Sequence, residues 1–185
     1  MSAVRLDKFV KRTDVRGRGR LVELAWLTAQ ALFVSSWQPS SWLRVRVMSL
    51  FGAQIGEGVV VKPGVQVKFP WKLKIGDHSW IGERVWIDNL AQVTVGAHCC
   101  LSQGAYLCTG NHDWSSPEFD LIVKPIVLGD GAWLGAHSRV SPGVVVGEEA
   151  VLSMGSVATG DLAPSMIYAG NPAEVIKPRD IKISQ

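Results

Sequence analysis

Aliphatic residues recur at every sixth position through most of the chain after residue 54. The repeated positions form five groups of three: Ile55, Val61 and Val67; Ile75, Ile81 and Ile87; Val95, Leu101 and Leu107; Leu128, Leu134 and Val140; and Val146, Leu152 and Ala158. Such a period predicts a triangular solenoid, because each hexapeptide supplies one short strand and one corner, and three complete a turn. Stacked turns bury the aliphatic positions in columns that no single turn would form alone. The pattern therefore predicts an all-β fold, a parallel β-helix of about five coils over residues 55–165.

The intervals between turns show where the repeat is interrupted. The first residues of successive turns are 20, 20, 33 and 18 residues apart, and a regular turn takes 18. Each excess follows the third hexapeptide of its turn, so all the insertions are expected at one corner of the prism. The longest, a loop at residues 113–127, opens directly after His112. Long loops on a rigid scaffold commonly carry functional residues, which makes this corner the expected site.

Residues 1–54 precede the repeat and begin with a basic leader. Residues 1–20 contain seven lysines and arginines and two aspartates, whereas the rest of the chain has a net charge of −2. The leader is either a solvated terminus or a contact for anionic lipid or another polyanion. Its single aromatic residue, Phe9, gives little support to nucleic-acid binding, and no nucleic acid is expected as a partner.

An apolar segment, residues 21–37, follows the leader. It is shorter than the roughly 20 apolar residues that span a membrane, and it lacks the cleavage pattern of a signal peptide. We expect a helix packed on the core or on a partner. Trp26, Phe33 and Trp37 beside the basic leader also leave open a peripheral contact with a membrane surface. After the repeat, residues 166–185 are expected to form a short C-terminal tail.

Composition agrees with the periodicity. The chain of 185 residues is 47% hydrophobic and 19% charged, which suits one domain with a solid core and excludes wholesale disorder. Nineteen glycines and 24 valines favour short strands with tight corners over a helix bundle. The three cysteines, Cys99, Cys100 and Cys108, have neither disulfide-framework nor zinc spacing. A reducing, cytoplasmic location is therefore expected, with Cys108 as a packing thiol.

Four segments carry a resemblance to a known family. They are residues 75–83, which begin Ile-Gly-Asp, residues 93–107, residues 128–133, which begin Leu-Gly-Asp, and residues 168–173, Tyr-Ala-Gly-Asn-Pro-Ala. With the hexapeptide repeat, they resemble the hexapeptide acyltransferases, and residues 101–113 most resemble acetyltransferases attributed to colanic acid biosynthesis. The resemblance covers residues 20–178. It implies a left-handed coil, which spacing alone does not give, a homotrimer, and acetyl-CoA as co-substrate in grooves between subunits, with no metal.

The resemblance also implies roles for individual residues. His112 matches the catalytic histidine of the family. The positions expected at the cofactor groove are Trp133, Gly135 and Ala136 at the pantetheine end and Met154 and Thr159 toward the nucleotide. Gly160 and Glu174 stand where relatives often carry basic residues, which weakens the expected grip on the cofactor phosphates. Lys177, Arg179 and Lys182 are the candidates to replace that grip.

Acetyl transfer from a thioester to a hydroxyl needs a base for the proton and donors for the oxyanion. An imidazole suits the first role because it exchanges protons near neutral pH, and backbone amides near Gly135 and Ala136 are expected to serve the second. The residues expected to hold the acceptor or to orient His112 are Asp88, Asn89, Asp113, Trp114 and Glu118, with the Trp114 and Phe119 rings suited to stacking on a sugar. The other histidines, at positions 78, 98 and 137, are expected to be corner residues.

Several functions remain open on the sequence alone. The leading one is O-acetylation of a sugar hydroxyl in polysaccharide biosynthesis, with a carbohydrate acceptor. Alternatives are an acetyltransferase for a xenobiotic, a thiogalactoside or an amino-sugar nucleotide, and a non-catalytic solenoid scaffold. A zinc carbonic anhydrase on this solenoid would need three converging histidines, and the chain has no HxxxxH pair.

Overall fold

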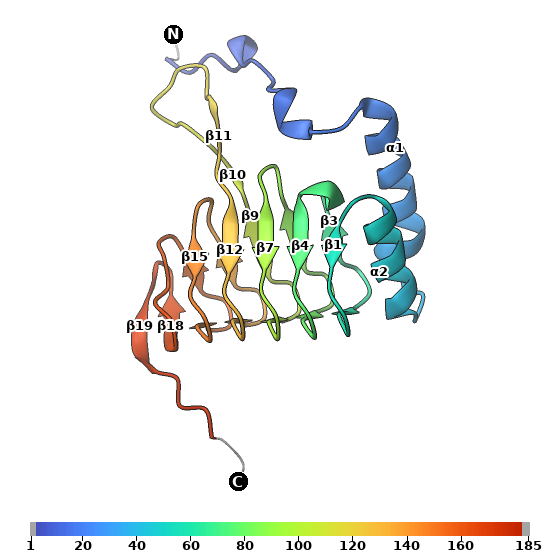
Figure 1. Cartoon of the computed structure of the whole chain (residues 1–185). Coiled ribbons are helices and arrows are strands. Elements are labelled where there is room, and N and C mark those ends of the chain that lie inside the picture. The colour runs from blue at the N-terminus through green and yellow to red at the C-terminus, as the bar shows by residue number, and fades with distance from the viewer. Residues whose placement is uncertain (1–2, 183–185) are drawn as a thin grey trace.

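The computed structural model describes residues 3–182, which form a triangular parallel β-solenoid with helices at one end (Figure 1). Sheet 1 contains β1 (Gln54–Ile55), β4 (Leu73–Ile75), β7 (Val93–Val95), β12 (Ile126–Leu128) and β15 (Val145–Val146). Sheet 2 contains β2 (Val60–Val61), β5 (Trp80–Ile81), β8 (Cys100–Leu101), β13 (Trp133–Leu134), β16 (Val151–Leu152), β18 (Met166–Gly170) and β19 (Ala173–Pro178). Sheet 3 contains β3 (Gln66–Val67), β6 (Trp86–Asp88), β9 (Tyr106–Cys108), β14 (Arg139–Val140) and β17 (Val157–Ala158).

The strand registers confirm the predicted columns. In sheet 1, Ile75 pairs with Ile55 on one side and Val95 on the other, and Leu128 pairs with Val95 and Val146. Equivalent positions pair in sheets 2 and 3. Nearly all of these aliphatic side chains are buried, so each sheet contributes one continuous column to the core.

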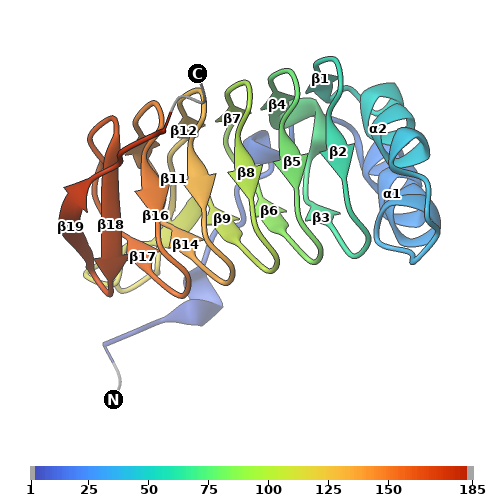
Figure 2. The same ribbon diagram turned by 90° about the horizontal axis from the view of Figure 1, so that it is seen from below.

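The solenoid extends beyond the five predicted coils to about six. Leu162 bridges to Val146, and Tyr168 in β18 pairs in parallel with Leu152. β18 then turns back into the antiparallel strand β19, so these residues of the expected tail lengthen sheet 2 (Figure 2). The six-residue spacing is lost after residue 158, which is why the sequence did not indicate this last turn.

The predicted apolar helix is present and covers the open first turn. It consists of α1 (Arg20–Ala29), continued by the π-helical turn η3 (Gln30–Val34), and is followed by α2 (Ser41–Leu50). The buried Trp26 donates from Nε1 to the carbonyl of Val67 at 2.9 Å, and the Gln30 side chain accepts from the Val67 N–H at 2.7 Å. A first turn without such partners would leave an open sheet edge. The helices therefore stabilise the end of the solenoid.

Arg44 of α2 is buried and acts at the same end of the solenoid. Its guanidinium donates to the carbonyls of Val34, Ser36 and Val61 and thereby joins η3 to the first turn. No helix within residues 3–182 is both long enough and apolar enough to cross a membrane.

The basic leader packs along the solenoid instead of extending into solvent. It contains two short 3-10 turns, η1 (Leu6–Lys8) and η2 (Asp14–Arg16). We call residues 3–19 the strap, because they run from the tip of the long insertion to the start of α1 (Figure 1). The Arg5 N–H donates to the carbonyl of Pro117 at 2.7 Å, and Trp71 Nε1 donates to the carbonyl of Arg16 at 2.7 Å.

All the insertions lie at the corner between sheets 3 and 1, which we call the insertion corner. The first forms the 3-10 turn η4 (Pro70–Lys72). The longest forms an antiparallel hairpin of β10 (Gly110–His112) and β11 (Leu121–Val123), which projects from the prism (Figure 1). The prediction of a loop at residues 113–127 is thus corrected: the excursion begins at Gly110 and is largely strand and turn, because the two arms pair their backbones.

Candidate active site

His112 ends β10 where the turn of the hairpin begins, directly opposite Leu121 of β11. Its backbone N–H donates to Asn111 Oδ1 at 2.8 Å. The side chain is half-buried, so the imidazole is held by the hairpin but is not sealed in the core. The sequence prediction that this histidine lies where the repeat is interrupted is confirmed.

One hydrogen bond determines which ring nitrogen of His112 carries the hydrogen. Nδ1 lies 2.6 Å from the backbone carbonyl of Phe119. A carbonyl oxygen can only accept, so Nδ1 carries the hydrogen and the neutral ring presents its lone pair at Nε2. Phe119 has a left-handed backbone conformation, with φ of 59°, at the end of the hairpin turn. The sequence suggested carboxylates as candidates to orient the ring, and the structure uses a main-chain carbonyl instead.

Two aromatic rings restrict the imidazole further. Phe119 stacks on it with centroids 4.7 Å apart and an interplanar angle of 18°. Phe9 of the strap meets it edge to face at 5.6 Å and 61°. Phe119 therefore covers His112, which corrects the expectation that its ring is free to stack on a sugar. Phe9 was not predicted, since nothing in the sequence links residue 9 to residue 112.

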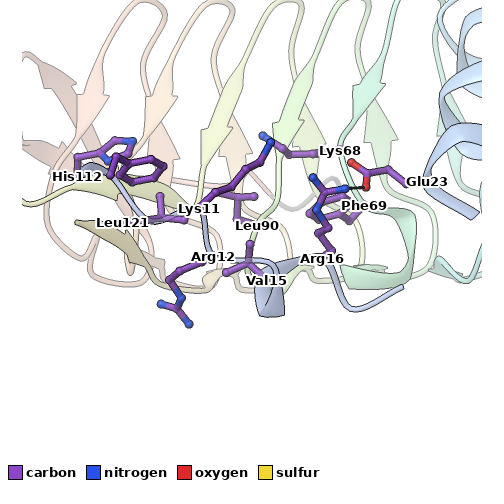
Figure 3. Close-up of a pocket in the computed structure, with 11 residues that line it drawn as sticks. Lys11, Arg12, Val15, Arg16, Glu23, Lys68, Phe69, Leu90, His112 and Leu121 are labelled. Carbon is purple, nitrogen blue, oxygen red and sulfur yellow. Dashed lines mark hydrogen bonds and ion pairs between the residues drawn. The ribbon is translucent and has the colours of Figure 1, made fainter. Parts of the chain in front are cut away.

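His112 lines two separate cavities. The first, of about 400 Å³, lies between the strap and the prism and is lined by His112, Phe9, Leu121 and a group of cationic side chains (Figure 3). The second, of about 540 Å³, lies on the hairpin and the last turns of the insertion corner. A histidine that borders two cavities is placed to act on two substrates.

The second cavity brings together several predicted site residues. Asp113, Trp114 and Thr159 line it with His112, and Lys124 adds a cation. Hydrogen bonds from Ser115 to the Asp113 carboxylate lower the pKa of that carboxyl. Trp114 is 81% exposed, so its ring is available to a ligand.

Asn89 does not act as the sequence suggested, and Asp88 does not orient His112, whereas a role of Asp88 in acceptor binding stays a prediction. Asn89 is fully buried; its Oδ1 accepts from the Phe69 N–H at 2.9 Å, and its Nδ2 donates to the carbonyls of Phe69 at 2.7 Å and Lys72 at 2.9 Å. Both polar atoms of its side chain are occupied by backbone groups of the preceding turn. The prediction that Asn89 binds the acceptor is therefore wrong. Asp88 pairs with Lys68 at 3.0 Å and does not contact His112.

The remaining groups near this corner are packed rather than reactive. The Asp88 carboxylate also accepts from the Tyr106 hydroxyl at 3.3 Å, and burial raises the pKa of Tyr106. Cys108 directs its Sγ to the carbonyl of Gly110 at 3.0 Å, in keeping with the predicted packing role. Glu118 is exposed on the hairpin.

The other predicted cofactor residues lie away from both cavities beside His112. Trp133 is on the outer face of sheet 2 and donates from Nε1 to Ser102 Oγ at 2.9 Å. Gly135, Ala136 and Met154 follow at the corner between sheets 2 and 3, where Met154 is 76% exposed. The Gly135 N–H donates to the carbonyl of Leu152 at 2.7 Å. That amide is therefore unavailable as an oxyanion donor, which corrects this part of the prediction.

The three basic residues near the C-terminus differ in their surroundings. Arg179 donates from Nη1 to the carbonyls of Gly131 at 2.9 Å and Glu149 at 2.8 Å, so it fastens the end of the chain. Lys177 and Lys182 are exposed. Gly160 is exposed at the insertion corner, beside Thr159.

The other three histidines hold corner positions, as predicted. His78, His98 and His137 all have φ values between 56° and 58°. His78 and His98 stack on each other in successive turns, with centroids 5.2 Å apart. Across residues 3–182, no group of three or more histidine, cysteine, aspartate or glutamate side chains is arranged to hold a metal ion.

Comparisons with known proteins agree with this architecture. A family model described as the hexapeptide repeat of succinyl-transferase matches residues 125–159. The "Putative colanic acid biosynthesis acetyltransferase WcaF" of Escherichia coli (strain K12) is 39% identical over 165 residues, which cover 88% of this chain and 90% of that protein.

Two solved structures are also similar. The hexapeptide-repeat acetyltransferase VCA0836 of Vibrio cholerae superposes with a TM-score of 0.82 over 95% of this chain and 98% of its own, at 21% identity. A galactoside acetyltransferase in complex with coenzyme A superposes with a TM-score of 0.77 over 86% of this chain and 82% of its own, at 25% identity. The fold is that of the left-handed β-helix acetyltransferases, which confirms the expected hand.

Proposed function

The chain belongs to the hexapeptide-repeat acyltransferase family, and we propose that it transfers an acetyl group from acetyl-CoA to a sugar hydroxyl with His112 as the general base. The observation that carries this proposal is the hydrogen bond from His112 Nδ1 to the Phe119 carbonyl, which leaves Nε2 free to take a proton. Relatedness to a protein of colanic acid biosynthesis supports a sugar of an extracellular polysaccharide, or its precursor, as the acceptor.

The chemistry follows from that nitrogen. His112 Nε2 removes the hydroxyl proton as the acceptor oxygen attacks the thioester carbonyl, and the ring becomes an imidazolium. The bond between the acceptor oxygen and the carbonyl carbon forms, and the tetrahedral intermediate collapses with loss of the CoA sulfur. The imidazolium then returns its proton to the thiolate. The Phe119 carbonyl stabilises the charged ring, because Nδ1–H remains its donor throughout.

We propose a homotrimer with the acetyl-CoA groove between subunits. In one chain His112 and Thr159 line the same cavity, whereas Trp133 and Met154 lie at other places on the prism. A second copy would bring the two sets together. Three tryptophans, at positions 80, 86 and 133, are 45–57% exposed on the outer faces of sheets 2 and 3, which suits burial against neighbouring subunits.

Acceptor-dependent release of CoA thiol tests the function directly. Wild-type protein and His112→Ala are incubated with acetyl-CoA and a panel of glycosides, nucleotide sugars and oligosaccharides, and free thiol is followed optically. We expect thiol release that requires a sugar hydroxyl and is lost in His112→Ala. Full turnover by His112→Ala would overturn the assignment of the base. Absence of acetyl-CoA binding by calorimetry at millimolar concentration would favour a non-catalytic scaffold.

We further propose a cytoplasmic enzyme that touches the membrane surface through its helical end. The side of α1 and η3 that faces away from the solenoid is apolar, and Leu21, Leu24 and Leu32 on it are 61–83% exposed. Trp42 of α2 is 66% exposed beside Arg46, and this pairing of aromatic and basic groups suits an anionic interface. The wild-type protein should float with anionic vesicles. The triple variant Leu21→Asp, Leu24→Asp and Leu32→Asp should stay in the dense fraction. Equal flotation of both proteins would disprove the membrane contact.

A further inference from the structure

The cavity between the strap and the prism carries positive charge that acetyl transfer does not itself require. Four cationic side chains line it against one carboxylate, that of Glu23; they are Lys11, Arg12, Arg16 and Lys68. Three of them belong to the strap, and Lys68 directly follows β3. The fold therefore assembles one charged wall from two distant segments, next to His112.

Two of these cations are already neutralised or directed elsewhere. Arg16 forms an ion pair with Glu23 inside the cavity, and both side chains are largely buried. Arg12 pairs with Asp14, and Figure 3 shows its guanidinium pointing away from the other cations. These two arginines line the cavity, but their positive charge is already compensated by a carboxylate.

Within the described part of the chain, Lys11 is the lining cation without a partner, and Lys68 is the one whose partner carboxylate lies outside the lining of the cavity. Among residues 3–182, Lys11 has no hydrogen-bond or ion-pair partner. Lys68 pairs at 3.0 Å with Asp88, a carboxylate that does not line the cavity, and its side chain is still 43% exposed. Both side chains line the cavity, and in the view of Figure 3 their ammonium groups end near each other. With Lys11 unpaired among these residues and Lys68 beside it in the lining, the cavity keeps uncompensated positive charge, which suits an anionic ligand.

The rest of the lining restricts what the ligand is. Phe69, Leu90 and Leu121 provide apolar surface on which a sugar ring can lie. In acetyl-CoA the pantetheine arm separates the phosphates from the sulfur, which must lie beside His112, so we do not expect the phosphates in a cavity that His112 itself lines. An anion in this cavity therefore belongs to the other substrate.

The geometry points to an acceptor that carries an anionic group, a uronate carboxylate or a sugar phosphate, held by Lys11 and Lys68 while its hydroxyl faces His112. The inference rests on the proposed function, since it names the acceptor class for the same base. It gives Lys11 of the basic leader a ligand that is a sugar instead of a nucleic acid. The two chemical sources of the anion are separated by experiment.

Calorimetry on the full-length protein saturated with CoA tests the site without turnover. The probes are methyl β-D-glucuronide, α-D-glucose 1-phosphate and the neutral methyl β-D-glucoside. We expect at least one anionic probe to bind tenfold or more tightly than the glucoside, and which one does so identifies carboxylate or phosphate. A double variant, Lys11→Gln with Lys68→Gln, should lose about tenfold or more of that affinity. Lys74→Gln, which removes the same charge from an exposed position of sheet 1, should lose none.

Three results would overturn the inference: the glucoside binding as tightly as both anions, no binding of any probe, or equal affinities in the double variant and Lys74→Gln. Its failure is distinguishable from failure of the proposed function. If thiol release is lost without His112 but is the same without Lys11 and with charged or neutral acceptors, the anion site is disproved and the proposed function stands. Anion binding that needs Lys11, with thiol release indifferent to His112, would remove the base and leave the anion site.

Discussion

The corner between sheets 1 and 2 and the insertion corner differ more than any other two parts of the solenoid. At the first, a glycine follows the aliphatic residue of sheet 1 in five successive turns, at positions 56, 76, 96, 129 and 147. A Cβ at any of them would come within 3.0 Å of backbone in the next turn. At the insertion corner, no two turns have the same connection.

This difference shows where a stacked repeat can form a functional site and where it cannot. Where turns stack at van der Waals contact, each corner must match the next, and the side chains have no freedom to form a site. At the insertion corner the match is relaxed. There a buried asparagine, a hairpin and the strap take the place of repetition, and the candidate base lies among them.

The largest expected effect compares two histidines, one from each corner. His112→Asn should lower kcat by about 10²–10⁴-fold, the range for loss of a general base. His98→Asn should leave kcat within about twofold, because His98 only stacks on His78 and asparagine tolerates its left-handed backbone. Steady-state kinetics with thermal melting checks both. Comparable losses of kcat in the two variants would show that the corners do not divide structure from catalysis.

Glycine substitutions probe the packing of the same two corners. Gly76→Ala should destabilise the fold by about 3 kcal/mol or more, since its Cβ would meet the Ala97 nitrogen at 2.5 Å and the Gly96 carbonyl carbon at 2.6 Å. Gly160→Ala should change stability by less than about 1 kcal/mol, because no atom lies within 4 Å of its Cβ. Urea unfolding measures both, and similar free energies of unfolding would contradict tight stacking at residue 76.

The asparagine in the insertion corner should be structural. Asn89→Ala should cost about 2 kcal/mol, because it leaves buried donors and acceptors of the Phe69 and Lys72 backbone without partners. Asn111→Ala, at an exposed position of the hairpin, should cost less than about 0.5 kcal/mol. Urea unfolding again decides. A fully stable Asn89→Ala protein with impaired acceptor binding would restore the sequence-based assignment.

The smallest expected effect concerns the strap. Phe9→Ala should lower kcat about two- to tenfold with little change in the acetyl-CoA KM, because an edge-to-face contact that orients His112 contributes about 0.5–1.5 kcal/mol. Phe9→Tyr should restore kcat, since it keeps the ring. Val10→Ala, the exposed neighbour, is the matched control. Loss of stability without a change in kcat would assign Phe9 a packing role only.

The two regions also differ in how far the sequence predicts them. Columns such as Ile75 and Val95 were predictable because a six-residue period determines both neighbour and register. The insertion corner was located by the departures from that period, and His112 was singled out by its place there. The contacts within the corner depend on side-chain direction, and this is why buried Asn89 and ion-paired Asp88 could not be told apart.

Contacts between segments that lie far apart in the sequence were the second feature that the sequence did not predict. The contact of Phe9 with His112 and the placement of Lys11 opposite Lys68 join segments with no periodic relation, so no pattern in the sequence reports them. The Phe119 carbonyl is equally invisible, because any residue type offers a carbonyl and only the fold of the hairpin aims it.

The strap imposes an order on the maturation of the enzyme. Arg5 leaves the ribosome more than a hundred residues before Pro117, the partner of its backbone N–H. The early turns can already be stacked on the helices, and Trp71 can already bind the end of the strap, while Arg5 still has no hairpin to bind. The contact between the strap and the hairpin therefore forms late in biosynthesis, and nascent chains arrested before the hairpin emerges carry the helices and the first three turns without His112.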